Sequence, residues 1–355
     1  MLINGWPIRK DAKIFLAALL LVVFMNEYIV YKIQSYRWPT FPDIDRDLNK
    51  CQVALLIGDP QLQGYQDESF FPFGMITRWD VDRYLWKTFA HAFDYSQPDV
   101  IIFLGDLFDE GSKAFPEEYK STLDRFQSIF PQTSYMKTIY IPGDNDIGGE
   151  DYDIPFQWKR DRYERTFGNV SDLIKFGFVD YAKLDIVSYQ LSERKLKDAQ
   201  DLQKKITSPI TVMLNHNLMS VNVKHFVYPI TRRLRPKLIF SAHFHTAWLH
   251  SCTDCLRDDE YSWDISKQEL TYLDSYLTLD MTATNSMFEI TVPTASYRMG
   301  TPNIGYGLAI ISADKTVQFT VLWSPRRYTM LIAYLIVLAL GSLLMCLTRC
   351  SRRPR

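Results

Sequence analysis

The chain has 355 residues, of which 47% are hydrophobic and 14% aromatic, and its formal net charge is −1. This length and apolar content can fill a sizeable core. The lack of a basic excess excludes DNA and RNA as partners, because nucleic-acid binding depends on lysine and arginine contacts to phosphates. Five cysteines are too few for a disulfide scaffold, so the core has to stabilise the fold largely unaided.

An apolar stretch near the N-terminus, residues 14–31, is about the length that spans a bilayer. A cleaved signal peptide is the alternative, but no small-residue cleavage site follows the apolar run, so an uncleaved anchor is favoured. Arg9, Lys10 and Lys13 precede the stretch, and by the positive-inside rule they keep the N-terminus in the cytoplasm. The sequence therefore predicts a cytoplasmic tail at residues 1–13 and a transmembrane anchor after it.

A second apolar run, residues 329–348, predicts a transmembrane helix near the C-terminus. Arg326 and Arg327 precede this run, but the larger cluster of arginines follows it. By the same rule, residues 349–355 are predicted to form a second cytoplasmic tail.

The chain between the two spans would then face the lumen of the secretory pathway or the cell exterior. Residues 32–50 are predicted to be a lumenal linker, and residues 51–325 one large domain. The sequon that begins at Asn169 is consistent with a lumenal setting, although such triplets also arise by chance. Cys252 and Cys255 could form half a zinc site, a redox pair or a local disulfide, and the last is favoured because a second such pair is missing.

Three apolar segments with the pattern of buried strands each end in a turn that contains aspartate. They are residues 53–57 before Asp59, residues 100–104 before Asp106, and residues 138–141 before Asp144. Apolar residues at helical spacing predict helices between them, at residues 78–93 and 117–130. This order is typical of an α/β sheet, in which ligand sites lie at the carboxyl ends of the strands.

Aspartates and histidines at strand ends together predict a metal site. Three carboxylates that converge at one edge would repel one another at high cost unless a cation lies between them. His216, His243 and His245 also follow predicted strands, and the last two are spaced so that both imidazoles lie on one side of an extended chain. Carboxylate and imidazole make mixed sites for two divalent ions, and a shared carboxylate can bridge a pair about 3.5 to 4 Å apart.

The order of these motifs resembles that of the calcineurin-like metallophosphoesterases. Their signature is an aspartate turn, then Gly-Asp-x-x-Asp, Gly-Asn-His-Asp, a lone histidine and Gly-His-x-His. The resemblance implies an α/β fold, a four-layer αββα sandwich around a dinuclear metal site, here between two transmembrane helices. Within this family, the chain looks like the membrane-bound enzymes that remove an ethanolamine-phosphate branch from glycosylphosphatidylinositol (GPI) anchors. The features that carry this likeness are the two spans and the segments Gly58 to Gln61, Gly105 to Gly111 and Asp146 to Gly148.

The resemblance also implies roles for individual residues. The first metal would be bound by Asp59, Gln61 and His245, the second by Asp144, His216 and His243, and Asp106 would bridge the two. Asp109 and Asp146 match positions that orient the ligands. Because the donors include three carboxylates and an amide, manganese is favoured over zinc as the bound ion.

Four positions depart from the family's motifs. Ala242 replaces a glycine, Gln61 stands where many relatives have histidine, Asp144 replaces an asparagine, and Asn145 replaces the histidine thought to protonate the leaving group. An amide cannot perform general acid catalysis, and losing a general acid costs about 10² to 10⁴ in rate. His225 or a metal-bound water could compensate. Shifting the alignment would make Asn145 a ligand, but Gly143 and Asp146 are in register without a gap.

Two functions of different classes stay open. The first is an active lumenal phosphodiesterase of the endoplasmic reticulum or Golgi membrane, which removes ethanolamine phosphate from a mannose of GPI anchors and aids export of GPI-anchored proteins. The second is a metal-binding protein with little turnover that recognises GPI-anchored cargo. Seven plausible donors favour the first, because a dead site would be expected to have lost histidines too. A cytosolic protein phosphatase is disfavoured, since the spans put the site in the lumen.

Overall fold

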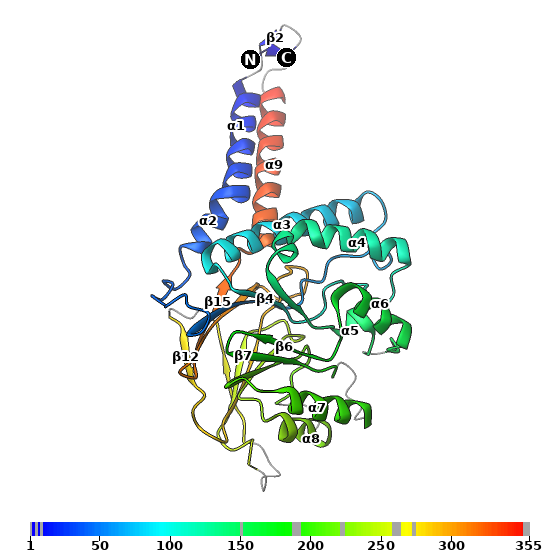
Figure 1. Cartoon of the computed structure of the whole chain (residues 1–355). Coiled ribbons are helices and arrows are strands. Elements are labelled where there is room, and N and C mark those ends of the chain that lie inside the picture. Colours follow the sequence, from blue (N-terminus) through cyan, green and yellow to red (C-terminus); the bar gives the residue numbers. More distant parts are fainter. Residues whose placement is uncertain are drawn as a thin grey trace. The chain divides into compact units, whose positions relative to one another are not determined.

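A computed structural model describes residues 2–3, 6–7, 10–149, 152–186, 193–220, 224–257, 264–271 and 275–350. The chain forms two compact units: Met1–Arg37 together with Ser324–Arg355, and Trp38–Trp323. The first unit holds the long apolar helices α1 and α9, and the second holds the large sheets (Figure 1).

The terminal unit is built from two apolar helices that pack on each other. One runs through α1 (Lys10–Phe24), the π-helical turn η1 (Met25–Ile29) and α2 (Val30–Ser35), and the other is α9 (Arg327–Cys350). The short strands β1 (Leu2–Ile3) and β2 (Trp6–Pro7) precede them. By length and composition, Lys10–Ser35 and Arg327–Thr348 can each cross a membrane. The fold therefore has one apolar helix near each terminus, consistent with flanking transmembrane helices.

Polar side chains inside this helix pair are paired by hydrogen bonds between the two helices. Glu27 accepts hydrogen bonds from Arg327 at 3.1 Å and from the Tyr334 hydroxyl at 2.9 Å. The Asn26 amide donates to the backbone oxygen of Met330 at 2.8 Å. Polar groups within apolar helix pairs are costly unless they are paired in this way.

The central unit contains two mixed β-sheets. The six-stranded sheet has the order β12-β15-β14-β3-β4-β5 and the seven-stranded sheet the order β11-β10-β13-β9-β8-β7-β6. The strands of the first are β3 (Cys51–Ile57), β4 (Val100–Phe103), β5 (Lys137–Tyr140), β12 (Leu277–Asp280), β14 (Gly305–Ser312) and β15 (Thr316–Trp323). Those of the second are β6 (Asp172–Phe176), β7 (Val179–Lys183), β8 (Ile210–Leu214), β9 (Leu238–Ser241), β10 (Trp248–Cys252), β11 (Ser266–Glu269) and β13 (Met287–Thr291).

Helices cover the outer face of each sheet (Figure 1). α3 (Phe73–Ser96) packs on β3 and β14, and α4 (Pro116–Ile129) lies beside it. On the other side, α7 (Glu193–Lys205) and α8 (Lys224–Leu234) pack together, and α7 also contacts β6. The short helices η2 (Pro131–Ser134), α5 (Asp144–Ile147) and α6 (Gln157–Phe167) follow α4 in the chain. The predicted four-layer α/β sandwich is confirmed.

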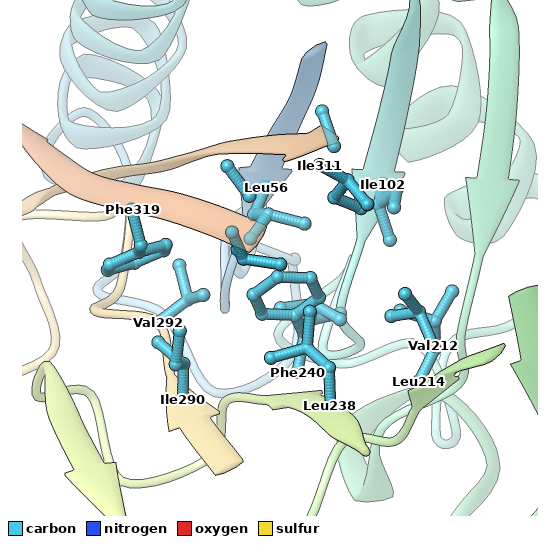
Figure 2. Close-up of a cluster of buried hydrophobic side chains, with 14 of the residues drawn as sticks. Leu56, Ile102, Val212, Leu214, Leu238, Phe240, Ile290, Val292, Ile311 and Phe319 are labelled. Atoms are coloured by element: carbon cyan, nitrogen blue, oxygen red, sulfur yellow. The ribbon is translucent and has the colours of Figure 1, made fainter. Parts of the chain in front are cut away.

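Apolar side chains from both sheets fill the space between them (Figure 2). Leu56 and Ile102 come from adjacent parallel strands of the first sheet, and their Cα positions are paired in register. Phe240 and Ile290 face them from the second sheet, and all four side chains are fully buried. Burial of each such side chain contributes roughly 1.5 to 3 kcal/mol. This core holds the carboxyl ends of both sets of parallel strands in fixed positions.

The predicted helix at residues 78–93 begins earlier in the structure, at Phe73. Phe73, Met75 and Ile76 are exposed, so they do not follow the core-facing spacing on which the prediction rested. The helix ends at Ser96, and the next residue, Gln97, caps it in a left-handed conformation with φ of 43° and precedes a proline. Cys252 and Cys255 form the local disulfide that the sequence favoured.

Candidate metal centre

Three aspartates lie at the carboxyl ends of neighbouring strands in the six-stranded sheet. Asp59 follows β3, Asp106 follows β4, and Asp144 begins α5 directly after β5. β4 pairs with both other strands in parallel, so the three strand ends meet at one edge. All three side chains are buried, the most accessible residue being 5% exposed.

Histidines from the seven-stranded sheet approach these aspartates. His216 follows β8, and its Nε2 lies 3.2 Å from Asp144 Oδ1 and 3.5 Å from Asp106 Oδ1. His243 follows β9, and its Nδ1 lies 3.2 Å from the same Asp144 oxygen. Its backbone N–H also donates to Asp59 Oδ1 at 3.3 Å. The site is therefore assembled between the two sheets.

Two triplets of side chains each bring one ligand atom per residue to within 4.8 Å of one another: Asp144, His216 and His243, and Asp59, Asp106 and His216. The first triplet matches the predicted ligands of the second metal. The second triplet contains two predicted ligands of the first metal, but it also contains His216, which was assigned to the second metal alone. His216 thus lies between the two groups in the structure.

Gln61 and His245 lie beside the second triplet. The Gln61 amide nitrogen donates to Asp106 Oδ2 at 2.9 Å and lies 3.5 Å from His245 Nε2. A half-turn of the Gln61 amide would instead present its oxygen, the atom that can bind a metal.

The orientation of His216 leaves one nitrogen for a cation. Its Nδ1 lies 2.7 Å from the carbonyl oxygen of Leu104, so Nδ1 carries the proton and donates to that oxygen in the neutral ring. Nε2 of His216 and Oδ2 of Asp59 are both buried without a hydrogen-bond partner among the described residues. Buried polar atoms are rarely left in this state, and a bound cation would satisfy both. The residues present therefore fit a metal centre.

Burial and neighbouring charges shift the pKa values of the site when no cation is bound. Burial opposes the protonation of His216 and His243, but the neighbouring aspartates raise the pKa of both. Burial raises the pKa of Asp59 to about 7, with Asp106 raising it further and His216 and His243 opposing the shift. Burial likewise raises the pKa of Asp106, despite the opposing effect of His216. Burial lowers the pKa of His245 to about 4, so its ring is neutral and able to bind a metal at neutral pH.

Backbone strain concentrates at the proposed ligands. Eight non-glycine residues have positive φ in the described part of the chain, and five of them are proposed metal donors. These five are Asp59, Gln61, Asp106, His243 and His245. Such conformations cost about 1 to 3 kcal/mol each and cluster at functional sites, where the surrounding structure enforces them. The strained backbone conformations therefore occur mainly at the residues that are proposed to bind metal between the sheets.

Asp146 connects the loops that carry two of the aspartates. Its carboxylate accepts hydrogen bonds from the backbone N–H of Leu107 at 3.1 Å, of Phe108 at 3.2 Å and of Gly143 at 2.9 Å. Burial raises its pKa to about 7, with Asp106 raising it further and these N–H groups opposing the shift. Asp146 thus holds the Asp106 loop and the Asp144 loop in one arrangement, a role consistent with the predicted orientation of ligands.

Asn145 binds the proposed bridging ligand. Its backbone N–H donates to Asp106 Oδ1 at 3.0 Å, and its side-chain amide donates to Asp106 Oδ2 at 3.0 Å. Two hydrogen bonds from one residue fix both oxygens of the Asp106 carboxylate. The residue that stands in place of the family's general acid is therefore a partner of Asp106.

Asp109 lies next to a charged pair that the sequence did not reveal. Burial raises the pKa of Asp109 to about 6, while Arg298 opposes the shift. Arg298 binds Glu68 at 2.6 Å. Neither residue belongs to a motif that the sequence analysis identified. His225 is the second residue of α8, but its side chain lies outside the described part of the chain.

A family model described as calcineurin-like phosphoesterase matches residues 53–247, a range that contains all seven proposed metal donors. The chain belongs to the calcineurin-like phosphoesterase family. This membership and the two triplets support the predicted class, a phosphoric ester hydrolase, and two divalent ions at the site.

Curated relatives match part of this calcineurin-like chain. Metallophosphoesterase 1 of Xenopus laevis is 29% identical over 171 residues, which are 46% of this chain and 40% of that protein. Cell division control protein 1 of Saccharomyces cerevisiae is 28% identical over 175 residues, 47% of this chain and 34% of that protein. The matches thus span less than half of these relatives. A solved dimetal phosphatase from Danio rerio covers 78% of this chain and 96% of its own, with 11% identity and a TM-score of 0.48.

Proposed function

We propose that this protein hydrolyses the phosphodiester that joins ethanolamine phosphate to a mannose of GPI anchors. The observation that carries the metal-dependent chemistry is the convergence of buried carboxylates and imidazoles from both sheets to within 4.8 Å. Support for the GPI substrate comes from the resemblance of the aspartate motifs and from the apolar helix near each terminus. Removal of the branch would aid maturation and export of GPI-anchored proteins, which are the proposed partners.

Some residues of the site would bind the ions, and others would hold these ligands in position. When bound, two divalent ions activate a water as nucleophile and neutralise charge on the phosphoryl oxygens. Asp106 would lie between the ions, and Asn145 fixes both of its oxygens. The Leu104 carbonyl oxygen keeps the His216 ring turned so that Nε2 faces the carboxylates. Manganese is proposed over zinc, because the donor set is rich in hard oxygen.

The leaving group limits the proposed reaction. A sugar oxygen leaves poorly unless it is protonated, and the Asn145 amide both lacks an acidic proton and is bound to Asp106. The reaction is therefore expected to be slow for a sugar phosphodiester and less affected for an ester with a good leaving group. This contact is also the observation that favours the second candidate, a metal-binding receptor for GPI-anchored cargo with little turnover.

We propose that the domain lies in the lumen of the endoplasmic reticulum or Golgi, in a protein that crosses the membrane twice. Basic residues before the first apolar helix and after the second support cytoplasmic termini. Asn169 is exposed between α6 and β6, so an oligosaccharide could be attached there without disturbing the core.

One experiment separates the two candidates. The purified full chain, loaded with manganese, is incubated with a GPI glycolipid that carries ethanolamine phosphate on its mannoses, and the products are analysed by mass spectrometry. Loss of one ethanolamine phosphate, absent with Asp106→Asn, is the expected result. Binding of the glycolipid without any loss of ethanolamine phosphate would support the cargo receptor instead.

A further inference from the structure

Large apolar side chains are exposed along α3 and the turn before it. We call this set the aromatic face: Phe70, Phe71, Phe73, Ile76, Trp79 and Trp86, each at least 49% exposed. Ile76, Trp79 and Trp86 lie three or seven residues apart and so share one side of the helix. Exposed apolar side chains that cluster in one place are typical of a surface that binds a partner or a membrane.

Beside the aromatic face, a hollow of about 470 Å³ opens between α3 and α4. Trp79 and Trp86 line it together with charges of both signs, among them Arg83 and Asp124. The Arg83 guanidinium lies 5.4 Å from the centre of the Trp79 ring. Tryptophan next to a basic side chain is typical of the boundary between lipid tails and water. An arginine, a carboxylate and two indole rings also match a zwitterionic headgroup, which carries a phosphate and an ammonium group.

The C-terminal end of α3 lies where the domain continues into the apolar helices. Trp38 and Trp323 are the first and last residues of the central unit, and the Trp38 indole donates to the Trp323 carbonyl oxygen at 2.9 Å. Trp38 also packs edge-on against Tyr95, in the last turn of α3, with ring centres 5.1 Å apart. Both chain connections therefore leave the domain beside this end of α3.

The N-terminal end of α3 supports the loop that carries Gln61. The Gln63 amide donates to the Thr77 hydroxyl at 3.0 Å, and Arg78 donates to the Gly64 carbonyl oxygen at 3.2 Å. With 24 residues, α3 is about 36 Å long. One helix thus extends from the chain connections to the edge of the metal centre.

We infer that the aromatic face and the adjoining hollow dock on the surface of a zwitterionic phospholipid bilayer. The docked face would hold the loop of Gln61 close to the membrane surface, within reach of a phosphodiester on a lipid-linked glycan. Continuity with two apolar helices selects a bilayer as the occupant over a second copy of the chain. The inference uses the membrane anchoring of the proposed function but not its GPI substrate.

The test measures membrane contact without catalysis. The full chain, with Cys346 and Cys350 replaced by serine, is placed in phosphatidylcholine nanodiscs at one chain per disc. An environment-sensitive fluorophore is attached to Ile76→Cys or Trp86→Cys, and its quenching by nitroxide-labelled phosphatidylcholine is compared with quenching by aqueous iodide. Lys204→Cys is the matched control, because Lys204 is exposed on α7, over the other sheet.

The expected result is several-fold stronger lipid quenching at residues 76 and 86 than at 204, with the reverse order for iodide. Equal quenching at all three positions would overturn the inference. If residues 76 and 86 were protected from iodide quenching only when two chains share a disc, the face would bind a second copy of the chain. That result would overturn the inference as well. Turnover of a soluble nitrophenyl phosphodiester, which should be the same in all three variants, shows that the labelled chains are folded and that any failure concerns docking alone.

Discussion

At the scale of single residues, Asp106 is the least replaceable member of the site. It is 2% exposed, lies 3.5 Å from His216, and is bound by Gln61 and by Asn145. Asp106→Ala is therefore expected to remove more bound metal than His245→Ala or Gln61→Ala, because the other two each lie at one side of the site. Atomic emission on the purified variants gives the metal content per chain. Equal metal content in all three would contradict the bridging role.

Asn145 offers a test of the missing proton donor. Asn145→His would introduce an imidazole at the family's general-acid position. It would also remove the hydrogen bond that the Asn145 amide donates to Asp106, which is worth about 1 kcal/mol. We expect turnover of a sugar phosphodiester to rise, and turnover of a nitrophenyl ester to change little, because nitrophenolate leaves without a proton.

Asn145→Ala is the control for this comparison. It removes the same hydrogen bond without adding a proton donor, so turnover of the sugar phosphodiester should not rise. If Asn145→His lowered turnover of both esters, support of Asp106 would be the main role of Asn145.

At the scale of elements, Asp146 unites the turns after β4 and β5. Asp146→Asn would direct an amide N–H at backbone N–H groups that now donate to a carboxylate. Such a change is expected to cost about 1 to 3 kcal/mol in the free energy of unfolding and to weaken metal binding by about 10- to 100-fold. Thermal unfolding and metal titration measure both effects. Asp94→Asn, at an exposed position of α3, should change neither.

The sequence predicted the elements whose apolar residues face the core. β3 and β4 are fully buried and end in aspartate turns, so both their position and their chemistry were readable. The start of α3 was not, because its first apolar residues face solvent. Arg298 binds Glu68, 230 positions earlier in the chain, and Asn145 binds Asp106, 39 positions earlier. No local sequence pattern encodes pairs so far apart.

At the scale of the whole molecule, the metal-free chain should become less stable as pH rises toward neutral. Asp59 and Asp146 both have pKa values raised by burial, from 3.8 to about 7. A carboxyl group with a raised pKa in the folded state stabilises the fold while protonated and loses that contribution as pH rises through the folded value. The Tm of the metal-free chain should therefore fall as pH rises from about 4 to about 7. Loading with manganese should abolish the fall, and a metal-free Tm that rises over this window would refute the account.

The proposed topology predicts modification and protection of the whole domain. Asn169 should carry an oligosaccharide when the chain is made in the presence of microsomes, and Asn169→Gln should remove the corresponding mass shift on electrophoresis. The domain should also survive protease added to sealed vesicles and be digested once detergent opens them. Digestion in intact vesicles would overturn the lumenal assignment.

Metal-dependent phosphodiester hydrolysis is the central claim for the molecule, and its most direct test is turnover by the full chain before chelation, after chelation and after metal is returned. We predict that chelation abolishes hydrolysis of a nitrophenyl phosphodiester, and that manganese restores it more fully than zinc. The Asp106→Ala variant should stay inactive under all three conditions. Hydrolysis that persists after the bound metal has been removed, or that never appears in the metal-loaded chain, would contradict the account.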